Sequence, residues 1–155
     1  MTKLETFALQ LQIARNALNN SIRYRQGILE GAYAEYFNGG CWRVVGITKK
    51  CLESLRDNDY NYQAVKPVRS HLHQRRETYV NVIESDMTPE EALQYIHERD
   101  IALLSLRSEN KDDGSLKAHV EINPDEGYFM STAVGYKFTK KNEVPYLQQL
   151  VENHL

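Results

Sequence analysis

Residues 66–77 of the chain are Lys66-Pro67-Val68-Arg69-Ser70-His71-Leu72-His73-Gln74-Arg75-Arg76-Glu77, and the way they fold decides the rest of the interpretation. At about 100° per residue, the apolar side chains around this stretch would share one helix face, formed by Val65, Val68, Leu72, Tyr79, Val82 and Ile83. Pro67 suits the first turn of such a helix, because its missing N–H would have no intrahelical partner there. The sequence therefore predicts a helix over residues 67–84. A strand over residues 78–83 is the alternative, because these residues are rich in β-branched side chains.

A long amphipathic helix is expected at the N-terminus. Its apolar residues recur at spacings of mostly three and four, at Leu4, Phe7, Leu11, Ala14, Leu18, Ile22 and Ile28. Thr2 and Glu5 are spaced as a capping box. We predict one helix over residues 3–29 that packs within its own domain, since Arg25 interrupts the pattern that a coiled coil would need. Thr48 can cap a second, short helix over residues 49–56.

The last third of the chain contains the strands. Thr88, Pro89 and Glu91 form a capping-box signature for a helix that ends at about Arg99. The apolar run 101–107 predicts a strand covered on both faces, residues 110–114 predict a turn, and the alternating runs 116–122 and 128–138 predict two more strands. Residues 124–127 form the turn between these runs. Residues 144–154 predict a closing helix.

The expected fold is therefore one α+β domain over residues 1–155. It is mostly helical in its N-terminal two-thirds, followed by a small antiparallel three-stranded meander and a closing C-terminal helix. A composition of 41% hydrophobic and 26% charged residues excludes disordered and membrane-spanning classes. The N-terminal residues do not form a signal peptide, and Cys41 and Cys51 have no metal-site spacing, so we expect a cytoplasmic protein with reduced thiols.

The best candidate for chemistry is a pair on the central helix, His71 and Arg75. On a helix they would be one turn apart at the edge of the apolar face, where both could project into a cleft. Histidine can transfer protons near neutral pH, and a guanidinium can neutralise a developing phosphorane. The alternative is structural: Arg75 pairs with a carboxylate such as Glu91 or Glu98.

A second, more exposed face would carry Arg69, His73 and Arg76, spaced i, i+4 and i+7. Such a stripe can follow a phosphate backbone. Other cations would extend it: Lys66 precedes the stripe, and Lys49 and Lys50 begin a helix whose N-terminus attracts anions. Because the net charge is −2, phosphate affinity would have to come from this local cluster. A charged, solubilising surface explains the same residues.

No metal or cofactor site is predicted. Asp100 and the Glu109-Asn110-Lys111 segment offer a divalent-metal alternative, but the two acids would lie roughly 30 Å apart at strand rise. His71 and His73 would point about 200° apart on a helix, so they could not share an ion. The sequence has no phosphate-binding glycine loop, nucleophile elbow or zinc-finger spacing.

The functional hypothesis is a nucleic-acid-binding, phosphodiester-handling protein, a small nuclease (hydrolase) that uses the basic His/Arg helix. The alternative is a non-catalytic protein-interaction module of the inhibitor or immunity type. Such a module would use the N-terminal helix, through which the chain could also form a homodimer, and the aromatic segment 33–42. We expect no membrane partner. DNA or RNA preference, catalysis itself and oligomeric state stay open.

Overall fold

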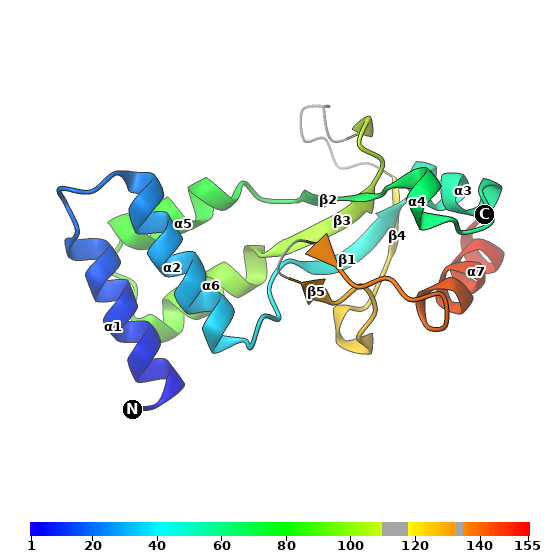
Figure 1. Ribbon diagram of the computed structural model, residues 1–155. Helices are drawn as coiled ribbons and strands as arrows, with labels where there is room; N and C mark the ends of the chain where they lie inside the picture. Colours follow the sequence, from blue (N-terminus) through cyan, green and yellow to red (C-terminus); the bar gives the residue numbers. More distant parts are fainter. Residues whose placement is uncertain (110–117, 133–134) are drawn as a thin grey trace. The chain divides into compact units, whose positions relative to one another are not determined.

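The computed structural model describes residues 1–109, 118–132 and 135–155. The chain divides into two compact units (Figure 1): unit 1 is formed by Met1–Cys41 and His73–Asp100, and unit 2 by Trp42–Leu72 and Ile101–Leu155. Unit 1 is helical and unit 2 contains the sheets, so the α+β class is confirmed. That the chain forms a single domain stays a prediction.

Unit 1 consists of four helices: α1 (Lys3–Asn16), α2 (Ile22–Tyr36), α5 (Arg75–Glu84) and α6 (Pro89–Arg99). Each contributes apolar residues at helical spacing to one core, which contains Phe7, Leu11, Ala14, Leu29, Ala32, Tyr33, Tyr79, Val82, Ile83, Ala92, Leu93 and Ile96. The capping boxes predicted at Thr2 and at Thr88 are both present. The helix predicted from the Thr88 signature is therefore confirmed.

The single N-terminal helix predicted over residues 3–29 is wrong, because the chain breaks between α1 and α2. Ser21 caps α2 by accepting a hydrogen bond from the Tyr24 N–H. Leu18 lies in the turn and is 77% exposed, although the spacing placed it on the apolar face. Asn19, Asn20 and Ser21 favour turns and helix caps. They end the helix here, although the helical spacing of apolar residues continues on both sides.

Cationic side chains occupy the C-terminal ends of these helices. The last carbonyl groups of a helix have no intrahelical partner, and the negative end of the helix dipole favours a cation. Three cations donate to such carbonyl oxygens on a neighbouring segment: Arg25 to Ala14 (2.7 Å) and Arg15 (2.9 Å), Arg15 to Val82 (3.1 Å), and Lys3 to Tyr36 (3.4 Å). Arg15 also donates to the Met87 carbonyl oxygen (2.9 Å) in the loop between α5 and α6. These cations therefore have structural partners in unit 1.

Unit 2 is built on a mixed four-stranded sheet with the order β2-β3-β1-β4. Its strands are β1 (Arg43–Thr48), β2 (Val68–His71), β3 (Ile101–Ser105) and β4 (His119–Glu121). Strand β3 is parallel to β1, whereas β2 pairs antiparallel with β3, and β4 pairs antiparallel with β1. β5 (Ser131–Thr132) and β6 (Gly135–Tyr136) form a separate small hairpin.

Helices α3 (Lys49–Asp57), α4 (Tyr62–Val65) and α7 (Glu143–His154), with the short 3-10 helix η2 (Pro124–Glu126), complete unit 2. The core of the unit contains Val44, Ile47, Cys51, Leu52, Leu55, Leu104, Val120, Ile122, Phe129, Leu147 and Leu150. The predictions of a short helix capped by Thr48 and of a closing helix are confirmed. A turn at residues 124–127 is confirmed as well, and Gly127 takes the left-handed φ of 80° there.

Gly46 allows the sheet to pack closely at the centre of β1. A Cβ atom at this position would lie 2.7 Å from Leu103 Cδ2 and 2.9 Å from His119 Cδ2, both far inside normal contact. The pairing of β1 with β3 also shifts register between Val44 and Gly46. Glycine is therefore required here by the approach of neighbouring strands.

The helix predicted over residues 67–84 is wrong in its first half. Val68–His71 forms strand β2, which pairs with β3 so that Arg69 lies opposite Leu104. Only the second half is helical, as α5, and the rival strand over residues 78–83 is therefore excluded. A short stretch with period-3.6 and period-2 apolar residues is ambiguous by itself, and here the free edge of β3 decides it. Pro67 is tolerated because it directly precedes an edge strand.

The three-stranded meander is not confirmed. β3 and β4 do not pair with each other, because both pair with β1, which comes from much earlier in the chain. The alternation in 116–122 is represented by β4, and that in 128–138 by the β5-β6 hairpin. The turn predicted at 110–114 and residues 116 and 117 lie outside the described residues.

Candidate functional site

The predicted catalytic pair is not on one helix. His71 ends strand β2 in unit 2, whereas Arg75 begins α5 in unit 1. The stripe of Arg69, His73 and Arg76 is wrong for the same reason: these residues lie in β2, in the segment between β2 and α5, and in α5. The predicted site residues therefore do not share a helix face.

Arg75 has a carboxylate partner within unit 1. Its Nη2 lies 3.3 Å from Glu30 Oε2, and both side chains are about three-quarters buried, with 25% and 26% exposed. The structural alternative predicted from the sequence thus holds for Arg75, although the partner is on α2 and not on α6. Arg75 also lines a crevice with Tyr79 and Asp100 that is too narrow for a water molecule. Burial raises the pKa of Tyr79, so its hydroxyl stays protonated.

Arg69 lies at the centre of a polar and aromatic group in unit 2. Its guanidinium carbon is 4.4 Å from the centroid of the Trp42 ring and 5.8 Å from that of Tyr136. Its Nη1 donates to Ser131 Oγ at 2.8 Å and to the Trp42 carbonyl oxygen at 3.4 Å. The His71 ring meets Trp42 edge to face at 4.7 Å. We call Trp42, Arg69, His71, Ser131 and Tyr136 the Arg69 cluster; all five are half-buried.

Strand geometry brings these residues together. Arg69 and His71 are two positions apart on β2, so both side chains leave the same face of this edge strand. Tyr136 comes from β6 and donates its hydroxyl to the Pro67 carbonyl oxygen at 2.9 Å, which ties the hairpin to the start of β2. Burial raises the pKa of Tyr136, which keeps this hydroxyl a donor.

Trp42 has an unusual backbone conformation. Its φ of 58° lies in the left-handed region, which a bulky side chain rarely adopts. This conformation costs on the order of 1 kcal/mol and persists only where surrounding contacts hold it. Such strain concentrates at functional positions. The Trp42 ring contacts Arg69 and His71 in this conformation.

More rings continue the cluster along unit 2. Tyr62 packs edge to face on Tyr136, with ring centroids 5.4 Å apart, and stacks on Phe138 at 3.9 Å. The buried hydroxyl of Tyr62 has no hydrogen-bond partner among the residues that the structure describes. The rings and the guanidinium therefore form a continuous series from Phe138 to His71.

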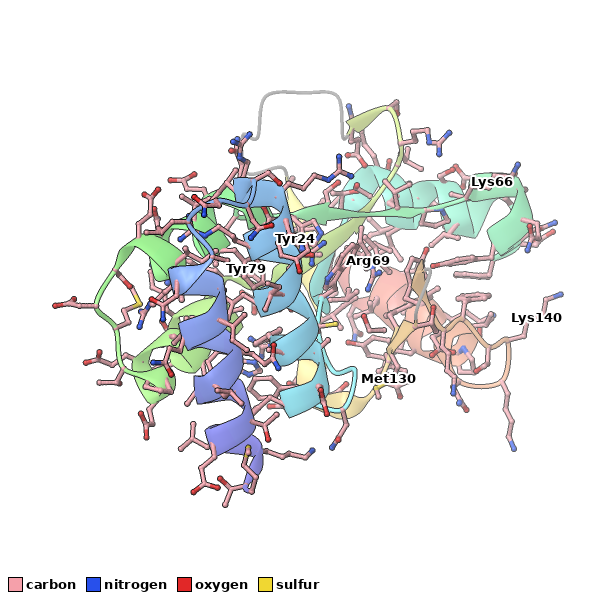
Figure 2. All side chains as sticks on the ribbon, turned by 60° about the vertical axis from the view of Figure 1, so that its left-hand side comes forward. Tyr24, Lys66, Arg69, Tyr79, Met130 and Lys140 are labelled. Carbon is pink, nitrogen blue, oxygen red and sulfur yellow. The ribbon has the colours of Figure 1, made fainter. Side chains whose placement is uncertain are left out.

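The predicted lysines of unit 2 are exposed and lie on two elements. Lys49 and Lys50 begin α3 at the far end of β1, roughly 20 Å from Trp42 at strand rise. Lys66 ends α4 in the left-handed conformation, three residues before Arg69, and is exposed. Figure 2 shows Lys66 and Arg69 among the side chains of unit 2. Of the predicted lysines, Lys66 is therefore closest in sequence to the Arg69 cluster.

The two acids of the metal alternative have other surroundings. Glu109 is buried and accepts hydrogen bonds from Thr48 Oγ1 (2.7 Å) and from the Leu106 N–H (2.8 Å), next to the N-terminus of α3. Asp100 is the C-cap of α6 in unit 1. Lys111 lies outside the described residues, and within residues 1–109, 118–132 and 135–155 no three His, Cys, Asp or Glu side chains gather to hold a metal ion.

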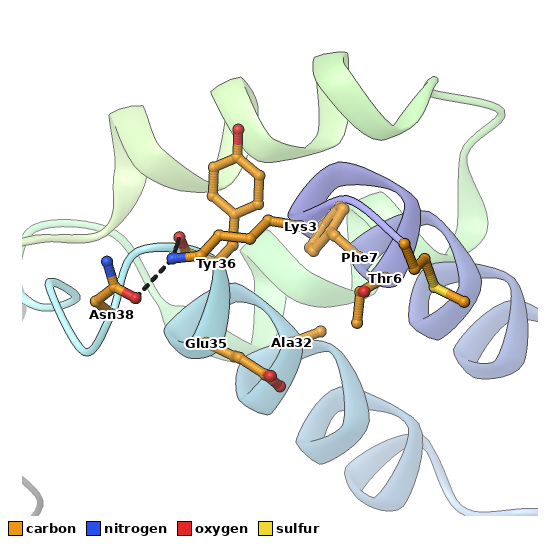
Figure 3. A pocket seen from close by; sticks show the side chains of 8 residues that line it. Lys3, Thr6, Phe7, Ala32, Glu35, Tyr36 and Asn38 are labelled. Carbon is orange, nitrogen blue, oxygen red and sulfur yellow. Dashed lines mark hydrogen bonds between the residues drawn. The ribbon is translucent and has the colours of Figure 1, made fainter.

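Unit 1 contains a groove of about 320 Å³ between the start of α1 and the end of α2 (Figure 3). It is lined by Met1, Lys3, Thr6, Phe7, Ala32, Glu35, Tyr36 and Asn38. The Lys3 ammonium is held by Asn38 Oδ1 at 2.6 Å, so this cation is used in joining the two helices. No sequence pattern indicated the groove, because its walls come from two segments, 1–7 and 32–38, whose lining residues are 25 to 37 positions apart.

No family model, curated protein or solved structure matches this chain. Among the described residues, none of the helices has the length and apolar character needed to cross a membrane. The sequence predicted Arg69 and His71 as site residues, and it predicted Trp42 only within the aromatic segment 33–42 of the protein-interaction alternative; Ser131 and Tyr136 were missed. Trp42 was the available signal, since it is the one tryptophan in the sequence and directly precedes a strand.

Proposed function

We propose that this protein binds nucleic acid through the Arg69 cluster of unit 2. The observation that carries the proposal is the position of Arg69, half-buried between aromatic rings and next to His71. A guanidinium matches the geometry of a phosphate, and aromatic rings stack on bases of any sequence. Lys66 and the lysines at the start of α3 would add contacts to the phosphate backbone.

Cleavage of the bound strand is the finer form of this proposal. His71 is its candidate for proton transfer, because a histidine can act as general acid or base near neutral pH. Arg75 is not part of this proposal, because it does not share a helix with His71 and pairs with Glu30 in unit 1. Incubation of the protein with mixed RNA and DNA tests cleavage: turnover that is lost in His71→Gln while binding is retained would support it.

The binding proposal is tested by the salt dependence of affinity, between about 50 and about 200 mM salt. Affinity should fall with a log–log slope of about −0.7 to −0.9 for each phosphate contact, and Arg69→Gln should remove about one contact from that slope. Arg76→Gln is the matched control, because Arg76 was predicted from the same stretch but lies exposed on α5 in unit 1. Absent binding at low salt, or an equal loss in both variants, would refute the proposal.

A second candidate function is a protein-interaction surface on unit 1. Leu9 and Ile13 are 45% and 43% exposed and lie one turn apart on α1. Leu18 and Tyr24 are exposed nearby in the chain, at 77% and 57%. By contrast, Tyr33 is 1% exposed, so the aromatic segment 33–42 is not a continuous surface.

Sedimentation velocity tests the homodimer form of this second candidate. A concentration-dependent dimer that Leu9→Ser with Ile13→Ser abolishes would support it, with Leu155→Ser as a control at an exposed apolar residue of unit 2. A monomer at every concentration would exclude self-association through α1.

A further inference from the structure

We infer that the nucleic acid bound by the Arg69 cluster is single-stranded, with an unpaired base stacking at Trp42. This inference rests on the proposed function and names its substrate class. It follows from the composition of the cluster, which combines aromatic rings with one guanidinium.

The aromatic rings and the Arg69 guanidinium follow one another in a series. Phe138 stacks on Tyr62, Tyr62 meets Tyr136, Arg69 lies near Tyr136 and over Trp42, and Trp42 meets His71. Consecutive centres are 3.9, 5.4, 5.8, 4.4 and 4.7 Å apart along this series. All six side chains are half-buried, so each has some surface in contact with solvent. A strand with unstacked bases can use such a series of flat groups.

A duplex would need a different kind of binding surface. Inside a duplex, base faces are stacked on one another, and a protein reaches only groove edges and phosphates. Recognition of a duplex therefore depends on several cations and on side-chain donors inserted into a groove. The Arg69 cluster has one arginine and no lysine. The whole chain has a net charge of −2 and so adds no general attraction for a duplex.

Trp42 has a strained backbone conformation. Glycine or asparagine would relieve the left-handed backbone there, but the chain has its one tryptophan at this position. Base–aromatic stacking is strongest on large rings and contributes about tenfold or more to affinity per base. The preference of this position for tryptophan is therefore explained by the ring and not by the backbone conformation.

The test is a titration of tryptophan fluorescence, excited at a wavelength that tyrosine does not absorb, so that the signal reports on Trp42, the one tryptophan of the chain. The probes are an oligothymidine of about 12 nucleotides and a DNA hairpin duplex of matched charge. We expect the single strand to quench Trp42 and to bind at least tenfold more tightly than the duplex. Trp42→Gly should lose about tenfold or more of that affinity by anisotropy of a labelled strand, and Trp42→Phe, which keeps a ring, should lose much less.

Trp42→Gly is suited to this comparison, since glycine accepts a φ of 58° without strain. Thermal melting of both variants establishes that they are folded, and Trp42→Phe provides a second folded variant if the glycine variant is not. Binding of single strand and duplex with equal affinity and no quenching would overturn the inference and leave the proposed function intact. No binding of either probe would overturn both.

Discussion

Cationic side chains have different surroundings in the two units. In unit 1, Lys3, Arg15 and Arg25 donate to helix-end carbonyl groups, and Arg75 pairs with Glu30. In unit 2, Arg69 lies against the rings of Trp42 and Tyr136 and donates to a serine hydroxyl. A local excess of positive charge in a sequence therefore does not identify an anion-binding surface. What a cation already contacts decides whether it can serve a ligand.

The largest expected difference between the units is in thiol reactivity. Burial raises the pKa of the Cys51 thiol in unit 2 to about 12, with a smaller effect from Glu109. Since the thiolate is the reactive form, native Cys51 should be alkylated on the order of a thousandfold more slowly than an ordinary thiol of pKa about 8.5. Half-buried Cys41 in unit 1 should react first. Mass spectrometry of peptides after brief alkylation measures both rates.

The same shift has a consequence for stability against pH. A neutral thiol is favoured in the folded protein, so the contribution of Cys51 to stability is complete below its unfolded pKa of about 8.5. It is then lost as pH rises toward about 12. Cys51→Ala should reduce the loss of stability above pH of about 9 relative to wild type. Rapid alkylation of native Cys51 at neutral pH would show that the thiol is accessible in the folded protein, contrary to this prediction.

A smaller effect is expected from removing a helix-end cation. Arg15→Ala should lower the free energy of unfolding by about 2–3 kcal/mol, because charge-assisted hydrogen bonds to the Val82 and Met87 carbonyl oxygens are lost from partly buried surroundings. Arg23→Ala is the control: Arg23 is exposed on α2 and should change stability by no more than about 0.5 kcal/mol. Urea denaturation measures both. Equal effects would mean that the carbonyl contacts of Arg15 contribute little.

The smallest effect concerns the N-terminal cap of α6. Thr88 Oγ1 accepts from the Glu91 N–H at 3.2 Å, and the Glu91 carboxylate accepts from the Thr88 N–H at 2.8 Å. Thr88→Ala should cost about 1 kcal/mol of stability, and Thr88→Ser should cost much less because it keeps the hydroxyl. Nucleic-acid affinity should not change in either variant. A shift in affinity without a shift in the denaturation midpoint would place Thr88 in the binding surface.

Local signals were sufficient for some elements of the fold. The capping boxes at Thr2 and Thr88 and the Thr48 cap predicted where helices begin, because their chemistry involves residues three apart. The strand after Asp100 and the final helix followed from short apolar patterns. The α+β class therefore followed from periodicity and capping alone.

Long-range pairing could not be predicted in the same way. Residues 68–71 became a strand because β3 offers a free edge, and β1 lies between β3 and β4 although it precedes both in the chain. These pairings connect residues 31 to 75 positions apart. The candidate site depended on them, because Arg69 and His71 were predicted on the wrong element. Trp42 was predicted only within the aromatic segment of the alternative function, and Ser131 and Tyr136 were missed, because only strand pairing and the hairpin bring them near Arg69.

The proposed function places the nucleic-acid contact in unit 2 and not in unit 1. Photocrosslinking of a bromouracil-substituted single strand to the intact wild-type chain, followed by mass spectrometry, would locate the contact residue by residue. We predict crosslinks at Trp42 and Tyr136 in unit 2, competed by unlabelled single strand and weakened by salt. Crosslinks confined to unit 1, at α1 or at the start of α5, would contradict the assignment of binding to the Arg69 cluster.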